Sequence, residues 1–187
     1  MLSQGAAGGL VATDNFAPVI YTGTGGVQSI SSLSFSPGMV WVKKRSSATS
    51  SNHQIQDTVR GIGSSGGAKI IYPDTTDAEA SNADTNYFRS FDSNGFTLGG
   101  NTYYNGSSET YVAWCWYAPT SESIGASGSR IASTVKKNVA AGFSIVQYTA
   151  GSATNQSIGH GLGVPPKLVL IKKTSGTEGW IGWYEGA

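Results

Sequence analysis

The chain has 187 residues, a formal net charge of +1 and only 12% charged residues, so it carries no strong electrostatic attraction for nucleic acid or anionic membranes. A hydrophobic content of 39%, with 11% aromatic residues, excludes a disordered chain. The single cysteine excludes an intramolecular disulfide framework, and no run approaches the roughly 18 apolar residues of a membrane span.

The first predicted strands follow a glycine-rich N-terminus. Residues 1–14, in MLSQGAAGGLVATDN, predict a flexible arm because they lack the basic and hydrophobic regions of a signal peptide. DSNG at 92–95 and YNGSS at 104–108 predict turns. Strands are expected at Ala17–Tyr21, Val27–Ile30, Gly38–Lys43, Ile55–Arg60, Lys69–Tyr72, Tyr87–Phe91, Gly95–Leu98 and Thr110–Tyr117.

Composition and strand spacing together favour an all-β fold. Glycine is abundant at 26 residues, Ser, Thr and Asn are frequent, and good helix formers are sparse. Short strands separated by turns predict an antiparallel β-sandwich of jelly-roll or lectin-like type over residues 15–118.

An internal repeat relates residues near Phe16 to residues near Phe143. Phe16 aligns with Phe143, Ile30 with Ile158, and Lys43 with Lys172, so the offset drifts only from 127 to 129 residues. Both copies read as a strand, a glycine turn, a QSI strand, a proline-containing loop and an apolar run ended by Lys-Lys. We interpret the pattern as a duplication, with the start of a second module at 142–187.

Residues 119–141 separate the two copies. Their first part is small, polar and glycine-containing, which predicts a linker. The stretch SRIASTVKKNVAA within it fits a short helix or an extended strand equally well. Because the second copy lacks the later strands of the first, either the protein continues beyond residue 187 or another chain completes the sheet.

The predicted strand Thr110–Tyr117 has no polar face. Tyr111, Ala113, Cys115 and Tyr117 would share one side, and Val112, Trp114 and Trp116 the other. One side meets the core, so the second needs a cover: another subunit, a crossing segment or the neighbouring unit. A buried tryptophan covers about 150–250 Å², so at about 25 cal/mol per Å² this side contributes several kcal/mol. We therefore predict an assembly interface at these three residues, in a homo-oligomer, with a homotrimer as the specific expectation.

Residues with catalytic or metal-binding chemistry do not form a recognisable constellation. His53 and His160 lack metal-ligand spacing, and we interpret both as turn histidines whose rings bond to backbone groups. Cys115 lies between two tryptophans without a basic neighbour, so it predicts a buried structural cysteine, not a nucleophile. We expect no catalytic residue, no cofactor and no metal site.

Three further segments have ordinary structural interpretations. GIGSSGG at 61–67 precedes a strand-like run, not a helix, and so predicts a loop and not a dinucleotide site. The acidic residues of segment 74–84 predict a solvated loop, because the segment lacks the pattern of a calcium loop. Both Lys-Lys pairs predict solvated strand ends.

Two groups of aromatic residues remain. Tyr103 and Tyr104 lie in an Asn/Gly/Ser loop, where they are candidates for glycan contact, with ordinary turn packing as the alternative. Trp180, Trp183 and Tyr184 are expected in the core of the second module.

The assembled motifs resemble those of a known group of proteins. YTGTGGVQSISSLSFSPGMVWVKKRS, SFDSNGFTLGG, NGSSETYVAWCW and SIGHGLGVPPKLVLIKK are similar to modules of marine bacteriophage virion proteins, including tail-fibre-like ones. The resemblance covers nearly the whole chain after about Asp14. It implies a virion component with lectin-like β-sandwich modules in series, and it supplies no catalytic residues.

The expected function is therefore structural. We predict a non-enzymatic bacteriophage virion protein, a multimeric tail-fibre or particle-surface component that contacts itself and other virion proteins and takes part in assembly and host attachment. The alternatives are a capsid decoration protein, or a lectin-like or glycan-degrading protein that binds a host surface glycan.

Overall fold

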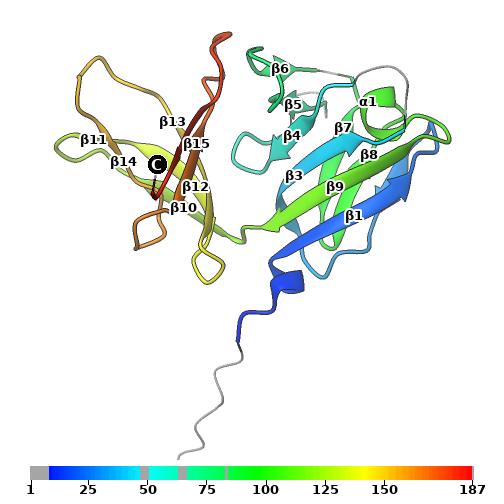
Figure 1. Cartoon of the computed structure of the whole chain (residues 1–187), viewed down its shortest axis with the longest axis horizontal. Coiled ribbons are helices and arrows are strands. Elements are labelled where there is room, and N and C mark those ends of the chain that lie inside the picture. The colour runs from blue at the N-terminus through cyan, green and yellow to red at the C-terminus, as the bar shows by residue number, and fades with distance from the viewer. Residues whose placement is uncertain (1–8, 47–50, 63–66, 83, 187) are drawn as a thin grey trace, which may run out of the picture.

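The computed structural model describes residues 9–46, 51–62, 67–82 and 84–186. Nearly every regular element is a β-strand, and the strand pairs are antiparallel except for one short parallel pair. The predicted all-β class is therefore confirmed. The strands form two units that lie side by side, joined where the last strand of the first unit leads into the second (Figure 1).

The first unit is built from strands β1 to β9 and two short helical turns. Its main sheet has the order β1-β9-β3-β4, a second sheet has the order β2-β8-β7, and β5 pairs with β6. The bounds are η1 Ala12–Asp14, β1 Phe16–Thr22, β2 Gln28–Ile30, β3 Pro37–Lys44, β4 Gln54–Asp57, β5 Lys69–Ile70, β6 Ala80–Ser81, β7 Phe88–Asp92, β8 Gly95–Leu98, α1 Thr102–Asn105 and β9 Thr110–Tyr117.

The second unit contains three small sheets. These have the orders β10-β12-β13, β11-β14 and β15-β16. The bounds are β10 Thr120–Ile124, β11 Arg130–Ile131, β12 Ser133–Asn138, β13 Phe143–Tyr148, β14 Ser157–Ile158, β15 Leu168–Ile171 and β16 Ile181–Tyr184.

Each of the eight predicted strands of the first unit overlaps an observed one, and the ends differ where side chains stop the pairing. Strand β4 ends at Asp57 and not at Arg60, because Asp57 Oδ1 accepts hydrogen bonds from the backbone N–H groups of Val59 and Arg60. This turns the chain away from the sheet. The turn predicted at DSNG connects β7 to β8, whose ends pair at Asp92 and Gly95.

The predicted linker at 119–141 is wrong, because this segment holds β10, β11 and β12. Strand β12 pairs with a neighbour on each edge, and its Val135 is fully buried. Tertiary pairing thus made a strand of the stretch that fitted helix or strand equally well. Of the predicted arm, residues 1–8 lie outside the described residues, and 12–14 form the 3₁₀ turn η1.

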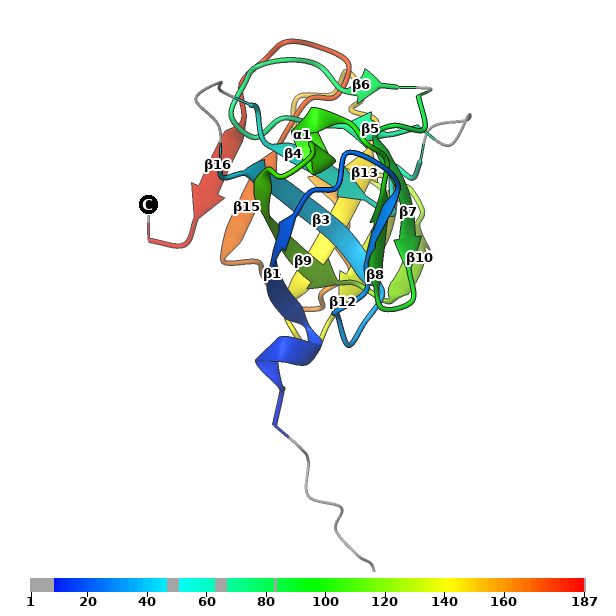
Figure 2. The ribbon, with the colours of Figure 1, turned by 90° about the vertical axis from the view of Figure 1, so that its right-hand side faces the viewer.

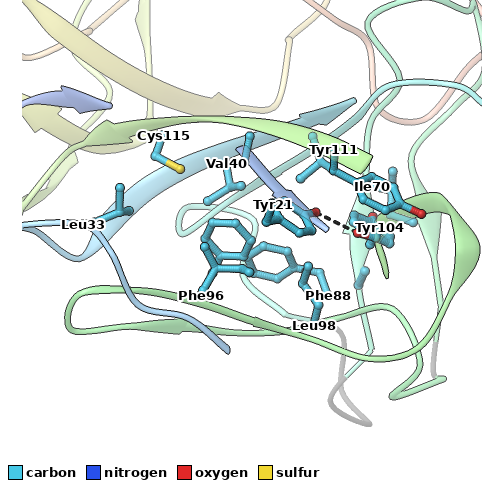
Figure 3. Packing of buried hydrophobic residues seen from close by; sticks show 14 of the residues in the cluster. Tyr21, Leu33, Val40, Ile70, Phe88, Phe96, Leu98, Tyr104, Tyr111 and Cys115 are labelled. Carbon is cyan, nitrogen blue, oxygen red and sulfur yellow. Dashed lines mark hydrogen bonds between the residues drawn. The ribbon is translucent and has the colours of Figure 1, made fainter. Parts of the chain in front are cut away.

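Both sheets of the first unit contribute to one hydrophobic core. The inward face of β9, formed by Tyr111, Ala113 and Cys115, is fully buried. Opposite it, Phe88 and Phe96 of the second sheet stack with ring centroids 5.6 Å apart. Figure 3 shows these side chains converging from the two sheets. The jelly-roll or lectin-like topology stays a prediction.

A group of hydrogen-bonded polar side chains lies within this core around Tyr104, whose side chain is fully buried. Gln54 and Gln56 come from the inward face of β4, and the Gln56 amide nitrogen lies 2.5 Å from the Tyr104 hydroxyl oxygen. That hydroxyl donates to Gln54 Oε1 at 3.2 Å. The Tyr21 hydroxyl donates to the Tyr104 carbonyl at 2.7 Å, as drawn in Figure 3. The group fixes α1 against the main sheet, because buried polar atoms need partners.

We predict that Tyr104→Phe lowers the free energy of unfolding by about 1–3 kcal/mol, since it leaves buried amide atoms of Gln54 and Gln56 without their partner. Urea unfolding followed by tryptophan fluorescence measures the change. Tyr103→Phe in the same turn is the matched control, and it should stay within about 0.5 kcal/mol of the wild type. Equal stability of all three proteins would contradict the role given to the Tyr104 hydroxyl.

Candidate functional site

The outer face of the main sheet is largely apolar. Val112, Trp114 and Trp116 of β9 point away from the core, as expected from the alternation, and all three are half-buried. Neighbouring strands extend the surface in register. Phe16 and Met39 lie beside Trp116, Pro18 and Trp41 beside Trp114, and Ile20 and Lys43 beside Val112.

The neighbouring unit covers one end of this face. The Trp116 ring stacks on Phe143 of β13 with centroids 5.9 Å apart and packs against Phe16 at 5.0 Å. A hollow of about 310 Å³ remains beside these rings, lined by Leu10, Ala12, Asn15, Phe16, Trp116, Ala141, Gly142 and Phe143. The neighbouring unit is thus the cover that the structure provides at Trp116. An assembly interface between subunits at Val112, Trp114 and Trp116 stays a prediction.

Hydrogen bonds also join the two units at their other end. Trp180 Nε1 donates to the Tyr72 carbonyl at 2.7 Å, and the Glu79 N–H donates to the Thr174 carbonyl at 2.9 Å. Near the hollow, Asn138 Nδ2 donates to Asn15 Oδ1 at 2.6 Å. The units are therefore linked both above and below the apolar face.

The prediction of solvated strand ends fails for Lys44 and Lys172, whereas Lys173 is exposed as expected. Lys44 is buried and pairs with Glu109 at 2.6 Å. In the second unit, Lys172 Nζ lies within hydrogen-bond distance of four backbone carbonyls, one of which belongs to Thr76 of the first unit. Lys44 ties the end of β3 to the residue before β9, and Lys172 closes the loop after β15, with carboxylate or carbonyl oxygens replacing the water that the ammonium groups would otherwise bind.

The aromatic surface continues from Trp114 to His53. Trp41 packs edge-on against Trp114 at 5.6 Å, and its Nε1 donates to His53 Nδ1 at 2.9 Å. The bond requires an unprotonated Nδ1. Burial lowers the pKa of His53, Asp74 opposes the shift, and Lys43 adds to it. His53 was expected to bond backbone groups, so its pairing with an indole is a difference from the prediction.

The remaining titratable residues serve structural contacts. His160 Nδ1 accepts from the Leu162 N–H at 3.3 Å, which confirms a turn histidine. Burial raises the pKa of the Cys115 thiol to about 12, so its thiolate is not available at neutral pH. In the described residues there is no group of three or more His, Cys, Asp or Glu that could hold a metal ion. The longest described α-helix has four residues, so none is a candidate membrane span.

Part of the acidic segment has a partner that sequence reasoning missed. Glu79 Oε2 lies 3.1 Å from the Arg60 guanidinium, which also contacts Asp57 at 2.6 Å. Arg60 and Asp57 are both buried. The three-residue spacing between Asp57 and Arg60 at the end of β4 was only a weak signal of this buried ion pair, because many pairs with that spacing are solvent-exposed. The triad ties β4 to the segment that contacts the second unit.

The structure separates the two tyrosines that were candidates for glycan contact. Tyr103 is 42% exposed on α1, and its role stays a prediction. Tyr104 is fully buried and bonded inside the core, so its assignment to glycan contact is wrong. Adjacent residues of one short helical turn point in different directions, which the loop-like composition did not reveal.

The C-terminal hairpin β15-β16 exposes apolar side chains in place of burying them. Trp183 and Tyr184 are 51% and 58% exposed, so the expectation that they form a core is wrong in this chain, while Trp180 is half-buried. Leu168 and Leu170 of β15 are 61% and 57% exposed. Leu168 pairs with Tyr184, and Leu170 lies on the same face, so these three side chains form an apolar patch on one face of the hairpin. Trp183 pairs with Val169 and lies on the opposite face.

Comparison with known proteins gives one match. A family model described as a domain of unknown function (DUF7483) matches residues 11–187. No curated protein and no solved structure matches the chain.

A double-mutant cycle on Trp116→Leu and Phe143→Leu is expected to give a coupling energy of about 0.5–1.5 kcal/mol, because stacked aromatic pairs contribute this much beyond their buried area. Urea unfolding of the four proteins measures it. The pair Trp116 and Tyr103, which lies on different surfaces, serves as the control and should show additive effects.

We predict that the stability contribution of the Trp41–His53 bond is lost in mild acid. Unfolded histidine binds a proton near pH 6.5, and the folded pKa is lower. The contribution is therefore complete above about pH 6.5 and disappears as the pH falls through the folded value. Between about pH 7.5 and 5.5, the wild type should lose more unfolding free energy than His53→Gln, whose neutral amide still accepts from Trp41.

NMR titration of the His53 ring is the direct measurement for that prediction. A ring pKa at or above about 6.5 would contradict it.

Proposed function

Because the chain belongs to the DUF7483 family, whose description assigns no function, we propose from its structure that it is a non-enzymatic assembly module. In this proposal it builds a multimeric bacteriophage particle as a tail-fibre or particle-surface component located in the virion. The resemblance of its motifs to marine bacteriophage virion modules supplies the biological setting. The proposal places binding to its own copies and to other virion proteins at the centre of its activity.

The single observation that supports the assembly role is the apolar patch on β15-β16. Three large apolar residues on one face of the hairpin, Leu168, Leu170 and Tyr184, each expose more than half of their surface. Isolated exposed apolar residues are ordinary, whereas a contiguous patch is typical of a protein interface. Fully burying a leucine side chain contributes about 1.5–3 kcal/mol, so several such residues supply enough free energy for association.

The internal duplication also supports a structural role. Two related units in series, joined at both ends of their shared face, form a repeated unit of the kind used to build extended assemblies. A tail fibre and a capsid decoration protein both fit this arrangement. A virion image that places the chain on the particle distinguishes them.

We predict that the purified chain is a multimer at micromolar concentration, measured by size-exclusion chromatography with light scattering. The double variant Leu168→Glu/Leu170→Glu should weaken association at least about tenfold, since it places two charges where the proposed interface buries two exposed leucines. Val27→Glu/Val139→Glu, at positions of similar exposure outside the hairpin, is the matched control and should associate like the wild type. A monomeric wild-type protein would overturn the assembly proposal.

A further inference from the structure

Three tyrosines that the assembly proposal does not use gather at one end of the first unit. Tyr72 follows β5, Tyr87 precedes β7 and Tyr103 lies in α1, and Figures 1 and 2 both show β5 and α1 at the same end of this unit. The Tyr87 ring packs edge-on against the buried Tyr104 ring, with centroids 6.1 Å apart. Tyr72 packs against the same core. Loops at the end of a rigid scaffold often carry binding residues.

A carboxylate lies beside these rings. Burial is the main cause of the raised pKa of the Tyr72 hydroxyl, and the charges that Tyr87, Tyr103 and Asp77 carry when ionised raise it further. Asp77 is exposed, and its Oδ2 accepts a hydrogen bond from Thr75 Oγ1 at 2.8 Å. Three phenol groups and one carboxylate therefore interact at this end of the unit, and we call these four residues the tyrosine cluster.

The polar atoms of the tyrosine cluster are available to a ligand. The hydroxyls of Tyr21, Tyr104 and Tyr111 all donate to oxygen atoms inside the protein, as buried hydroxyls must. Within the described residues, the three hydroxyls of the cluster make no hydrogen bond, and neither does Asp77 Oδ1. The cluster thus offers three groups that both donate and accept, and one that accepts only.

The turn that carries Tyr103 is fixed from beneath. The Tyr103 N–H donates to Asn101 Oδ1 at 2.9 Å, which caps α1. The next two side chains are buried: the Tyr104 hydroxyl is bonded in the core, and Asn105 Nδ2 donates to the Gly99 carbonyl at 2.9 Å. Because its neighbours are held in this way, the exposed Tyr103 ring is presented with little further ordering on binding.

The surroundings of the tyrosine cluster favour a neutral, hydroxyl-rich ligand. Among the described residues between 28 and 138, Tyr103 is the only exposed large hydrophobic side chain, so this surface lacks the apolar centre of a protein interface. Asp77 and Asp84 are exposed and form no ion pair within the described residues. Their negative charge disfavours ligands that carry carboxylate or sulfate groups.

We infer that the tyrosine cluster binds a neutral sugar ring, whose apolar face stacks on Tyr103 and whose hydroxyls bond to the phenol oxygens and to the Asp77 carboxylate. Tyrosine suits this role because its ring gives a rigid contact surface while its hydroxyl bonds to polar groups. The inference does not rest on the assembly proposal. It concerns one end of the first unit, whereas the proposed interface lies on the β15-β16 hairpin.

The test is saturation-transfer NMR on the wild-type chain with the methyl β-glycosides of glucose, galactose and mannose. At least one should bind with a Kd of about 1 mM, as the binding efficiency of small ligands gives for a single ring. Tyr103→Ala should weaken binding about three- to tenfold, because it removes the stacked ring. Tyr184→Ala, which removes an exposed tyrosine from the hairpin, is the matched control and should bind like the wild type.

Two further samples test the hydrogen bonds and the charge. Asp77→Asn should weaken binding, because its amide nitrogen cannot accept from a sugar hydroxyl. Methyl β-D-glucuronide should bind more weakly than the glucoside, because Asp77 repels its carboxylate. Unchanged tryptophan fluorescence shows that each variant is folded.

Three outcomes would overturn the inference. The first is no transfer to any of the three neutral glycosides, and the second is equal binding by Tyr103→Ala and the wild type. The third is tighter binding of the glucuronide than of the glucoside. If no glycoside binds and Tyr103→Ala reduces self-association in light scattering, the tyrosines belong to a protein interface. A monomeric wild-type chain that binds a glycoside would overturn the assembly proposal alone, so the two failures are distinguishable.

Discussion

Strand β9 pairs with a neighbouring strand on each edge and carries apolar side chains on both faces. Most of the first unit is arranged around these two requirements. Its backbone completes the ladders of β1 and β3, so removing it would leave two edges unpaired. Its inward side chains close the core against the second sheet, and its outward tryptophans form the surface that meets the second unit. A strand apolar on both sides folds stably because each side has a separate cover.

The two faces of β9 are covered in different ways. The core side is closed by tightly packed side chains and a small network of buried polar groups around Tyr104, in which the hydroxyl of Tyr104 bonds to the side chains of both Gln54 and Gln56. The outer side is closed in part by stacked rings and by hydrogen bonds from loops at the two ends of the junction. A tightly packed core fixes the shape of the unit, whereas the outer contacts fix where the next unit lies.

The predicted duplication relates several residues of the second unit to residues of the first that have a different neighbour. Pro18 in β1 protects an exposed edge, and its counterpart Ile145 stands where β12 provides a partner. Lys43 and Lys172 have the same role near the ends of β3 and β15, because each ammonium group donates hydrogen bonds to backbone carbonyls of the following loop. The residues that flank β9 in β3, Val40 and Val42, align with the apolar residues Val169 and Ile171 in β15.

The sequence by itself determined most strands of the first unit and the two-sided apolar character of β9, because alternation and turn residues act over a few neighbouring positions. It also predicted correctly that Cys115 is buried, because Cys115 lies on the core-facing side of an apolar strand. Only the tertiary structure decided that residues 119–141 are strands, that Tyr104 lies inside while Tyr103 lies outside, and that Trp183 is exposed. These outcomes depend on contacts between segments that are far apart in the sequence. Such contacts do not produce a pattern within a short stretch of sequence, so they could not be predicted from it.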